Sequence, residues 1–229
     1  MKWITDTTGK FGKRPYYSEA ELDAECESIA TALVTARRGS CTYPVTTDDL
    51  TVLIEKEADE LDLYADLSGE EGNVEGVTEF RVGKKPRVLI NCQLSGAHNL
   101  ENRLRTTLAH EYGHVHFHGF LHGLADANLS LFERAKEPII IKSKRETIDH
   151  MPAASDWMEW QAWYACGAIL MPKTALNQVV RDFYASGGEG DDAMVGHVAA
   201  QFQVSRDAAR VRLDRLRYVK ADRSTRSLF

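Results

Sequence analysis

The pattern of apolar positions predicts two helices in the first quarter of the chain. Ser18 and Glu21 have the spacing of a capping box, which opens a helix. Beyond them, apolar residues recur every three or four positions, as on the buried face of a helix: Leu22, Cys26, Ile29, Leu33 and Val34. Gly39 follows two arginines and is a typical helix end. A second helix is expected from Thr47 to about Asp59, because acidic residues in its first turn suit a helix N-terminus.

After this helix the apolar positions recur every second residue, which is typical of strands. Apolar and polar residues alternate at Leu61, Leu63, Ala65 and Leu67. After a turn over 68–73, the runs Val77–Val82 and Arg87–Leu94 have strand composition. The sequence therefore predicts a small, mostly antiparallel sheet of about three strands.

A long helix is expected from Asn99 to His118, with Gly119 as its end. The following stretch, up to Ser155, has weak periodicity and one β-like run at Ile139–Ile141, so we expect a loop with some strand. A helix opened by Ser155 and running to Leu170 comes next. The predicted fold class is α+β, with a small antiparallel sheet packed on the long helix.

Composition narrows the class of protein. Hydrophobic residues make up 43% and charged residues 27%, which are ordinary globular proportions. The first 13 residues lack the apolar run of a secretory signal, and no 18 consecutive residues are apolar, so we expect a soluble, cytoplasmic protein with no membrane partner. The four cysteines show no C-x-x-C spacing and are expected to be reduced thiols. Ligands of a metal would then be histidines and carboxylates.

The run His110-Glu111-Tyr112-Gly113-His114 has the pattern H-E-x-x-H. Residues four apart project from one face of a helix, so both imidazoles can bind one zinc ion. Glu111 lies about 100° round the helix and can act as the general base toward a water that the metal activates. The motif also arises by chance. However, it lies in an apolar helix stripe (Leu104, Leu108, Val115), where buried polar side chains need a partner.

A catalytic zinc site needs a third protein ligand, for which Glu159 is the best candidate. It lies on the helix expected to end at Leu170, whose packed face would carry Ala162, Cys166 and Ile169, so its carboxylate should point inward. Two other interpretations remain: a surface glutamate, or a hydrogen-bond acceptor for a ligand histidine.

These motifs resemble the phage- and stress-associated metallopeptidases of the ImmA/IrrE family. The resemblance rests on Arg105–His114, with His118 four residues beyond, and on Glu159–Ala162 followed by Ile169–Pro172. It covers roughly residues 18–172, and the paired signatures are more specific than H-E-x-x-H alone.

The resemblance implies a gluzincin-like zinc-peptidase fold with one zinc ion, held by His110, His114 and Glu159, and with Glu111 as catalytic base. Known members cleave helix-turn-helix transcriptional repressors, so the implied substrate is such a repressor in a stress or mobile-element regulatory circuit. The sequence departs from the family at Trp163, where Asn or Asp is common, and in the long gap between His114 and Glu159.

Stabilisation of the oxyanion needs a further donor. Tyr164, His150 and Tyr112 are all candidates, and the sequence does not choose among them. His118 is expected to be a hydrogen-bonded packing residue rather than a ligand, because a tetrahedral catalytic site takes three protein ligands.

The C-terminal end has a different character. Eight basic and three acidic residues give 205–229 a net charge of +5, which leaves −11 for the rest of the chain. The spacing from Val198 to Leu216 is that of a helix-turn-helix with Ser205 as cap. The sequence thus predicts a peptidase domain over 1–185 and a helical segment over 191–229.

Arg206, Arg210 and Arg212 could contact a nucleic acid or a partner. We favour packing or partner docking over DNA contact, because Arg and Asp dominate where recognition helices usually carry Asn, Gln or Ser. The second functional hypothesis is a non-catalytic, zinc-containing regulator that binds DNA or a repressor, or a toxin–antitoxin component. Replacement of Glu111 by Gln separates it from the peptidase.

Overall fold

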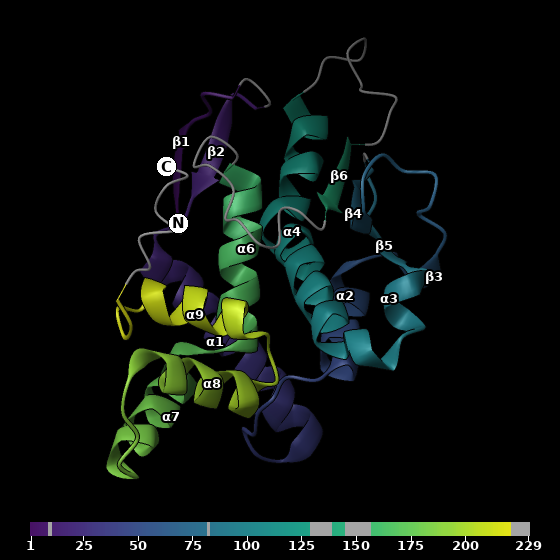
Figure 1. Ribbon diagram of the computed structural model, residues 1–229. Coiled ribbons are helices and arrows are strands. Elements are labelled where there is room, and N and C mark those ends of the chain that lie inside the picture. Colours follow the sequence, from purple (N-terminus) through teal and green to yellow (C-terminus); the bar gives the residue numbers. More distant parts are fainter. Residues whose placement is uncertain (9–10, 82, 129–138, 145–156, 221–229) are drawn as a thin grey trace. The chain divides into compact units, whose positions relative to one another are not determined.

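The computed structural model describes residues 1–8, 11–81, 83–128, 139–144 and 157–220, and shows an α+β protein (Figure 1). The chain forms two compact units. The first comprises Met1–Leu22 and Thr46–Cys166, and the second comprises Asp23–Val45 and Gly167–Phe229. This division differs from the expected boundary between residues 185 and 191, which stays a prediction about domains.

The main sheet of the first unit has four strands in the order β3-β5-β4-β6. Their bounds are Glu60–Ala65 for β3, Val74–Phe80 for β4, Arg87–Asn91 for β5 and Ile139–Lys144 for β6. β4 pairs antiparallel with both β5 and β6, as expected, whereas β3 pairs parallel with β5. The β-like run at 139–141 is confirmed as part of β6, which forms an edge of this sheet.

A second, two-stranded sheet joins β1 (Lys2–Thr5) to β2 (Lys13–Tyr16) in antiparallel pairing. The hydrophobic pattern did not predict it, because strands of four residues are too short to show a clear alternation of apolar and polar positions. Aromatic contacts hold this hairpin in the first unit: the ring of Tyr17 packs edge-on against Phe117, with 5.2 Å between centroids.

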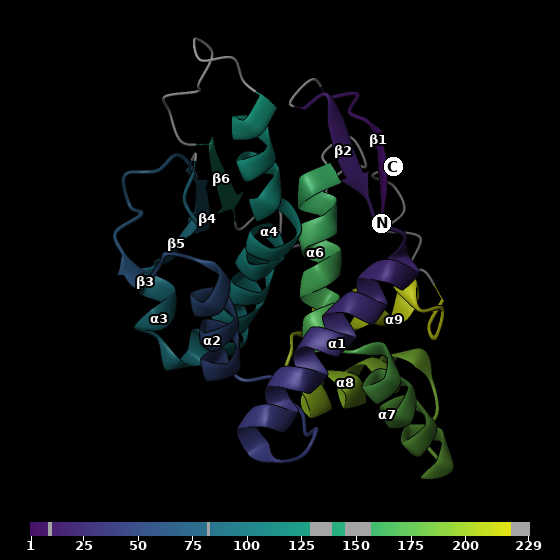
Figure 2. The ribbon, with the colours of Figure 1, turned by 180° about the vertical axis from the view of Figure 1, so that it is seen from behind.

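The long helix α4 (Glu101–Asn128) has the main sheet along one side and α6 (Trp157–Leu170) along the other (Figures 1 and 2). The expected end of α4 at Gly119 was wrong. A glycine inside a helix costs only about 1 kcal/mol relative to alanine. The buried residues on either side, Phe117 and Leu121, offset that cost, and Leu121 packs with Phe80 of β4 and Trp157 of α6.

The helix α2 (Thr47–Glu57) packs against α4 and confirms the second predicted helix. Its N-cap is Thr46, whose side chain accepts a hydrogen bond from the Asp49 N–H while the Asp49 carboxylate accepts one from the Thr46 N–H. Two short helical segments, α3 (Cys92–Ser95) and η1 (His98–Leu100), connect β5 to α4.

The second unit is helical. It contains most of α1 (Glu19–Arg38), together with α7 (Lys173–Ala185), α8 (Asp191–Phe202) and α9 (Arg206–Arg215). The α8–α9 pair has two helices joined by a short turn where the spacing predicted them: Gln203 adopts a left-handed conformation (φ 51°), and the Ser205 hydroxyl accepts from the Ala208 N–H at 3.1 Å. Ser18 caps α1 as predicted, accepting from the Glu21 N–H at 3.3 Å.

Among the described helices, none combines the length and the apolar character needed to cross a lipid bilayer.

Candidate metal centre

The two histidines of the H-E-x-x-H motif lie on one face of α4, one helical turn apart. Both His110 and His114 are fully buried, and their Nε2 atoms are 3.0 Å from each other. Two ring nitrogens this close in a buried site are the arrangement expected of a pair of metal ligands.

Glu159 reaches the same point from α6. Its Oε2 lies 3.4 Å from the Nε2 of His110, and its Oε1 lies 3.2 Å from the Nε2 of His114. Burial acts to raise the pKa of the Glu159 carboxyl, but the two imidazoles outweigh it and hold that pKa far below its ordinary value. A carboxylate is also the form in which a glutamate binds a metal ion.

These three side chains fit one metal ion. Their ligand atoms all lie within 4.8 Å of one another. Bonds of about 2.0–2.1 Å in tetrahedral geometry would place ligand atoms about 3.3 Å apart. The observed separations of 3.0, 3.2 and 3.4 Å bracket that value. Three protein ligands leave a fourth position for water or substrate, which distinguishes a catalytic site from a closed structural one.

Glu111 is fully buried between α4 and the sheet. Its Oε2 accepts a hydrogen bond from the Thr78 hydroxyl of β4, and its Oε1 accepts one from the Ser143 hydroxyl of β6, each at 2.5 Å. Burial raises the pKa of Glu111, although His114 and the two hydroxyls act in the opposite direction. A carboxylate with a raised pKa is a stronger base and can later release its proton, as general acid–base work requires.

The close approach of β4 to Glu111 depends on Gly76. A Cβ atom at this position would lie 2.3 Å from the Oε1 of Glu111, well inside van der Waals contact. Gly113 likewise permits the close approach of α4 to α6: a Cβ at this position would lie 3.0 Å from the Cα and from the carbonyl oxygen of Ala162. Neither glycine was predicted from the sequence to be part of the site. The only sequence signal for them is a glycine in the interior of a strand, at Gly76, and a glycine in the interior of a helix, at Gly113.

The two ligand histidines are supported differently. The Nδ1 of His114 lies 3.1 Å from the Nδ1 of His118, which has the hydrogen-bonded role expected of it. The ring of His110 instead packs on the indole of Trp163, with 4.1 Å between centroids and 38° between planes. Among the described residues, none forms a hydrogen bond with the Nδ1 of His110. The departure at Trp163 thus places a large ring beside a ligand.

The structure places the three candidate oxyanion-stabilising residues differently. Tyr112 points to the other side of α4, where its hydroxyl donates to Glu57 at 2.9 Å, so it does not suit that role. Tyr164 is buried beside Trp160, with 5.5 Å between ring centroids, and its role stays a prediction. His150 lies outside the described residues.

The candidate contact arginines pair within the second unit. Arg206 and Arg210 both donate to the Asp192 carboxylate at the start of α8, at 2.7 and 3.1 Å. Arg212 is buried and donates to Asp23 at 2.8 Å, so its guanidinium is not available to a nucleic acid in this structure. This corrects its assignment as a contact residue, because the guanidinium of Arg212 is paired with Asp23 inside the unit.

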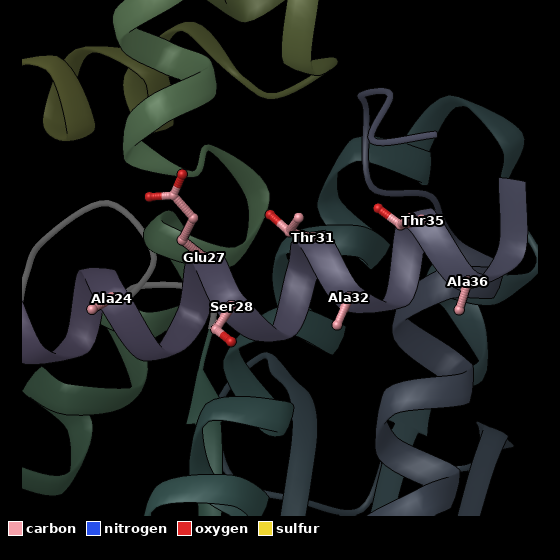
Figure 3. Close-up of a pocket in the computed structure, with 7 residues that line it drawn as sticks. All are labelled: Ala24, Glu27, Ser28, Thr31, Ala32, Thr35 and Ala36. Atoms are coloured by element: carbon pink, nitrogen blue, oxygen red, sulfur yellow. The ribbon is translucent and has the colours of Figure 1, made fainter. Parts of the chain in front are cut away.

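A pocket on α1 offers less chemistry (Figure 3). Its lining is mostly small: Ala24, Glu27, Ser28, Thr31, Ala32, Thr35 and Ala36. The one ionisable side chain in this lining, Glu27, accepts the N–H of Thr174 in the first turn of α7 at 3.2 Å. Glu27 therefore stabilises a helix N-terminus rather than forming a reactive group.

The family comparison agrees with the geometry. A family model described as the IrrE N-terminal-like domain, peptidase family M78, matches residues 67–214, which is more than half of the chain. The match includes both ligand-bearing helices and excludes the β1–β2 hairpin. No curated protein matches the sequence.

Proposed function

The chain belongs to the ImmA/IrrE family of metallopeptidases, and from that premise we propose that it is a zinc-dependent endopeptidase that cleaves a helix-turn-helix transcriptional repressor. The observation that carries the proposal is the convergence of the His110, His114 and Glu159 ligand atoms, with buried Glu111 beside them. Two ligands from one helix and a glutamate from a later helix form a gluzincin-like set.

Zinc is the metal we infer, because two imidazole nitrogens and one carboxylate oxygen in tetrahedral spacing suit it. When bound, the zinc would polarise the substrate carbonyl and lower the pKa of a water molecule. His110 and His114 would hold the ion through their Nε2 atoms, and Glu159 would add a negative charge that partly neutralises it.

Glu111 is the proposed base. It takes a proton from the attacking water and passes it to the leaving amine nitrogen as the peptide bond breaks, so it ends the cycle ionised again. Thr78 and Ser143 hold its two oxygens in place, and each carboxylate oxygen keeps a further lone pair that can accept the proton. Burial of the carboxyl favours the protonated state in mid-cycle.

The sheet supports a polypeptide as the substrate class. β6 is an edge strand, and among the described strands only β4 pairs with it. An extended peptide could add to this edge by main-chain hydrogen bonds. It would then run beside Ser143, the residue that contacts Glu111. The repressor as substrate, a stress or mobile-element circuit and a cytoplasmic site of action all follow from the family resemblance and are part of the same proposal.

The test compares wild type with Glu111→Gln. Purified proteins are incubated, with zinc or with a chelator, with a candidate helix-turn-helix repressor, the first choice being one whose gene adjoins that of this protein, and products are identified by mass spectrometry. We expect cleavage by the zinc-loaded wild type only. Glu111→Gln should keep about one zinc per chain yet lose roughly 10²–10⁴-fold in rate, the usual contribution of general acid–base catalysis.

His114→Ala serves as the matched control, because it should lose both zinc and activity. Repressor that stays intact with zinc-loaded wild type, together with equal function of Glu111→Gln, would instead identify a non-catalytic zinc-containing regulator.

A further inference from the structure

A chain of buried hydrogen bonds leads away from one metal ligand. The Nδ1 of His114 lies 3.1 Å from the Nδ1 of His118, and the Nε2 of His118 lies 3.1 Å from the Oε1 of Gln161. The Nε2 of Gln161 donates to the main-chain oxygen of Pro15 in β2, at 3.2 Å. The side chains of His114, His118 and Gln161 are at most 2% exposed, so water does not compete for these bonds.

The positions of the protons follow from the metal. If His114 binds with Nε2, that nitrogen carries no proton, and the neutral ring keeps its proton on Nδ1. The Nδ1 of His118 must therefore accept, which places the proton of His118 on its own Nε2. That N–H donates to the Oε1 of Gln161, and the amide group of Gln161 is left to donate to Pro15. In this arrangement every hydrogen bond of the chain is donated in the same direction, from His114 toward Pro15.

We propose that His118 and Gln161 are positioning residues for the metal, and that the β1–β2 hairpin holds them through the Pro15 carbonyl. They fix His114 in the tautomer whose Nε2 faces the ion, and they hold its ring in the correct orientation. The proposal rests on the metal-dependent function above. It assigns a role in the site to a segment outside residues 67–214, the part that the family model matches.

The hairpin is suited to this role because it is fixed on both sides of Pro15. The Arg14 guanidinium lies over the ring of Trp157 in α6, 5.2 Å from its centroid. Tyr17 packs on Phe117 of α4. Pro15 has no N–H and is buried, so its carbonyl needs a donor, and Gln161 supplies one.

The test measures zinc affinity, by competition with a chromophoric chelator at one pH, and records the absorption spectrum of the cobalt-substituted protein. His118→Leu removes the acceptor beside His114 and should weaken zinc binding about 10–100-fold, as loss of such a supporting partner typically does. Gln161→Leu should weaken it in the same direction. A changed cobalt spectrum in either variant would report a rotated ligand ring.

Two further variants separate hydrogen bonding from packing. In His118→Asn the new Oδ1 is bonded to Cγ, as Nδ1 is in histidine, so it can accept from His114. In His118→Gln the polar group lies one atom farther out, near the former Nε2. We expect His118→Asn to recover most of the affinity that His118→Leu loses, and His118→Gln to recover little.

His116→Asn is the control on the same helix, since His116 pairs with Glu57 of α2. It should leave zinc affinity unchanged. Wild-type affinity in His118→Leu, or equal affinity in His118→Asn and His118→Gln, would overturn the proposal. Tight zinc binding without proteolysis by the wild type would remove the proposed peptidase activity but leave this inference standing, because its readout is metal affinity.

Discussion

Gly76→Ala offers a sharp test of where the catalytic base lies. The added Cβ would lie 2.3 Å from the Oε1, 2.8 Å from the Cδ and 2.9 Å from the Cγ of Glu111. Ordinary contact between such atoms needs about 3.5 Å, so the carboxylate must retreat by about 1 Å. Gly76 is not among the glycines with positive φ, so the backbone itself accepts alanine. The effect therefore comes from the contact with Glu111.

The retreat has a cost that can be estimated. Moving the carboxylate by about 1 Å stretches the bonds from Thr78 and Ser143, now 2.5 Å each, toward the limit of hydrogen bonding. Over-packing of this kind costs about 1–3 kcal/mol of folding stability. A catalytic group misplaced by about 1 Å costs about 10²-fold in rate. The metal ligands are untouched, so zinc should stay bound.

The assay measures kcat and KM for cleavage of the protein substrate, the zinc content of each variant, and its unfolding by denaturant. Gly113→Ala is the matched control, because its Cβ would meet the backbone of Ala162 at 3.0 Å and push α4 away from α6. That change separates the histidines from Glu159 and should release zinc. Gly76→Ala with wild-type kcat, or with a loss of zinc equal to that of Gly113→Ala, would refute the placement of Glu111 against β4.

Two further predictions concern ionisable groups outside the metal cluster. Burial acts to raise the pKa of Glu57, but the hydrogen bond and charge of His116 outweigh it, so the folded-state pKa lies below its ordinary 4.5. The Glu57 side chain is 37% exposed, so solvent screens this pairing, and Glu57→Gln should lower the free energy of unfolding at pH 7 by less than about 1 kcal/mol. This deficit should shrink as pH falls below 4.5, which chemical denaturation can follow; an equal deficit at pH 3 would contradict it. Burial raises the pKa of the Cys166 thiol to about 12. Native protein should thus be labelled by a thiol reagent at exposed Cys41 and not at Cys166 until it unfolds, as mass spectrometry would show.

Local patterns predicted the helices well. The capping signals at Ser18 and Ser205 are confirmed, because a side chain three residues from its partner needs no tertiary structure to find it. Strand composition likewise predicted β3, β4 and β5. The predicted helix end at Gly119 was wrong, since the helix propensity of one residue is smaller than the burial free energy of its neighbours in a long helix.

The order of the strands was beyond local reasoning. β5 lies between β3 and β4, and β6 joins from a position in the chain beyond α4. This pairing decides which hydroxyls meet Glu111. Thr78 and Ser143 are 65 residues apart and carry no signal that relates them.

What the sequence determined by itself is the pair of imidazoles and the glutamate beside them, because residues four apart on a helix share a face whatever surrounds it. The spacing also supplied the candidate third ligand, Glu159, on an apolar helix. Only the tertiary structure decided that this carboxylate lies within 3.4 Å of both imidazoles, that a strand passes close enough to Glu111 to require glycine, and that His118 connects the site to β2. These are contacts between segments distant in sequence, and their formation depends on the free energy of packing the whole unit rather than on any local propensity.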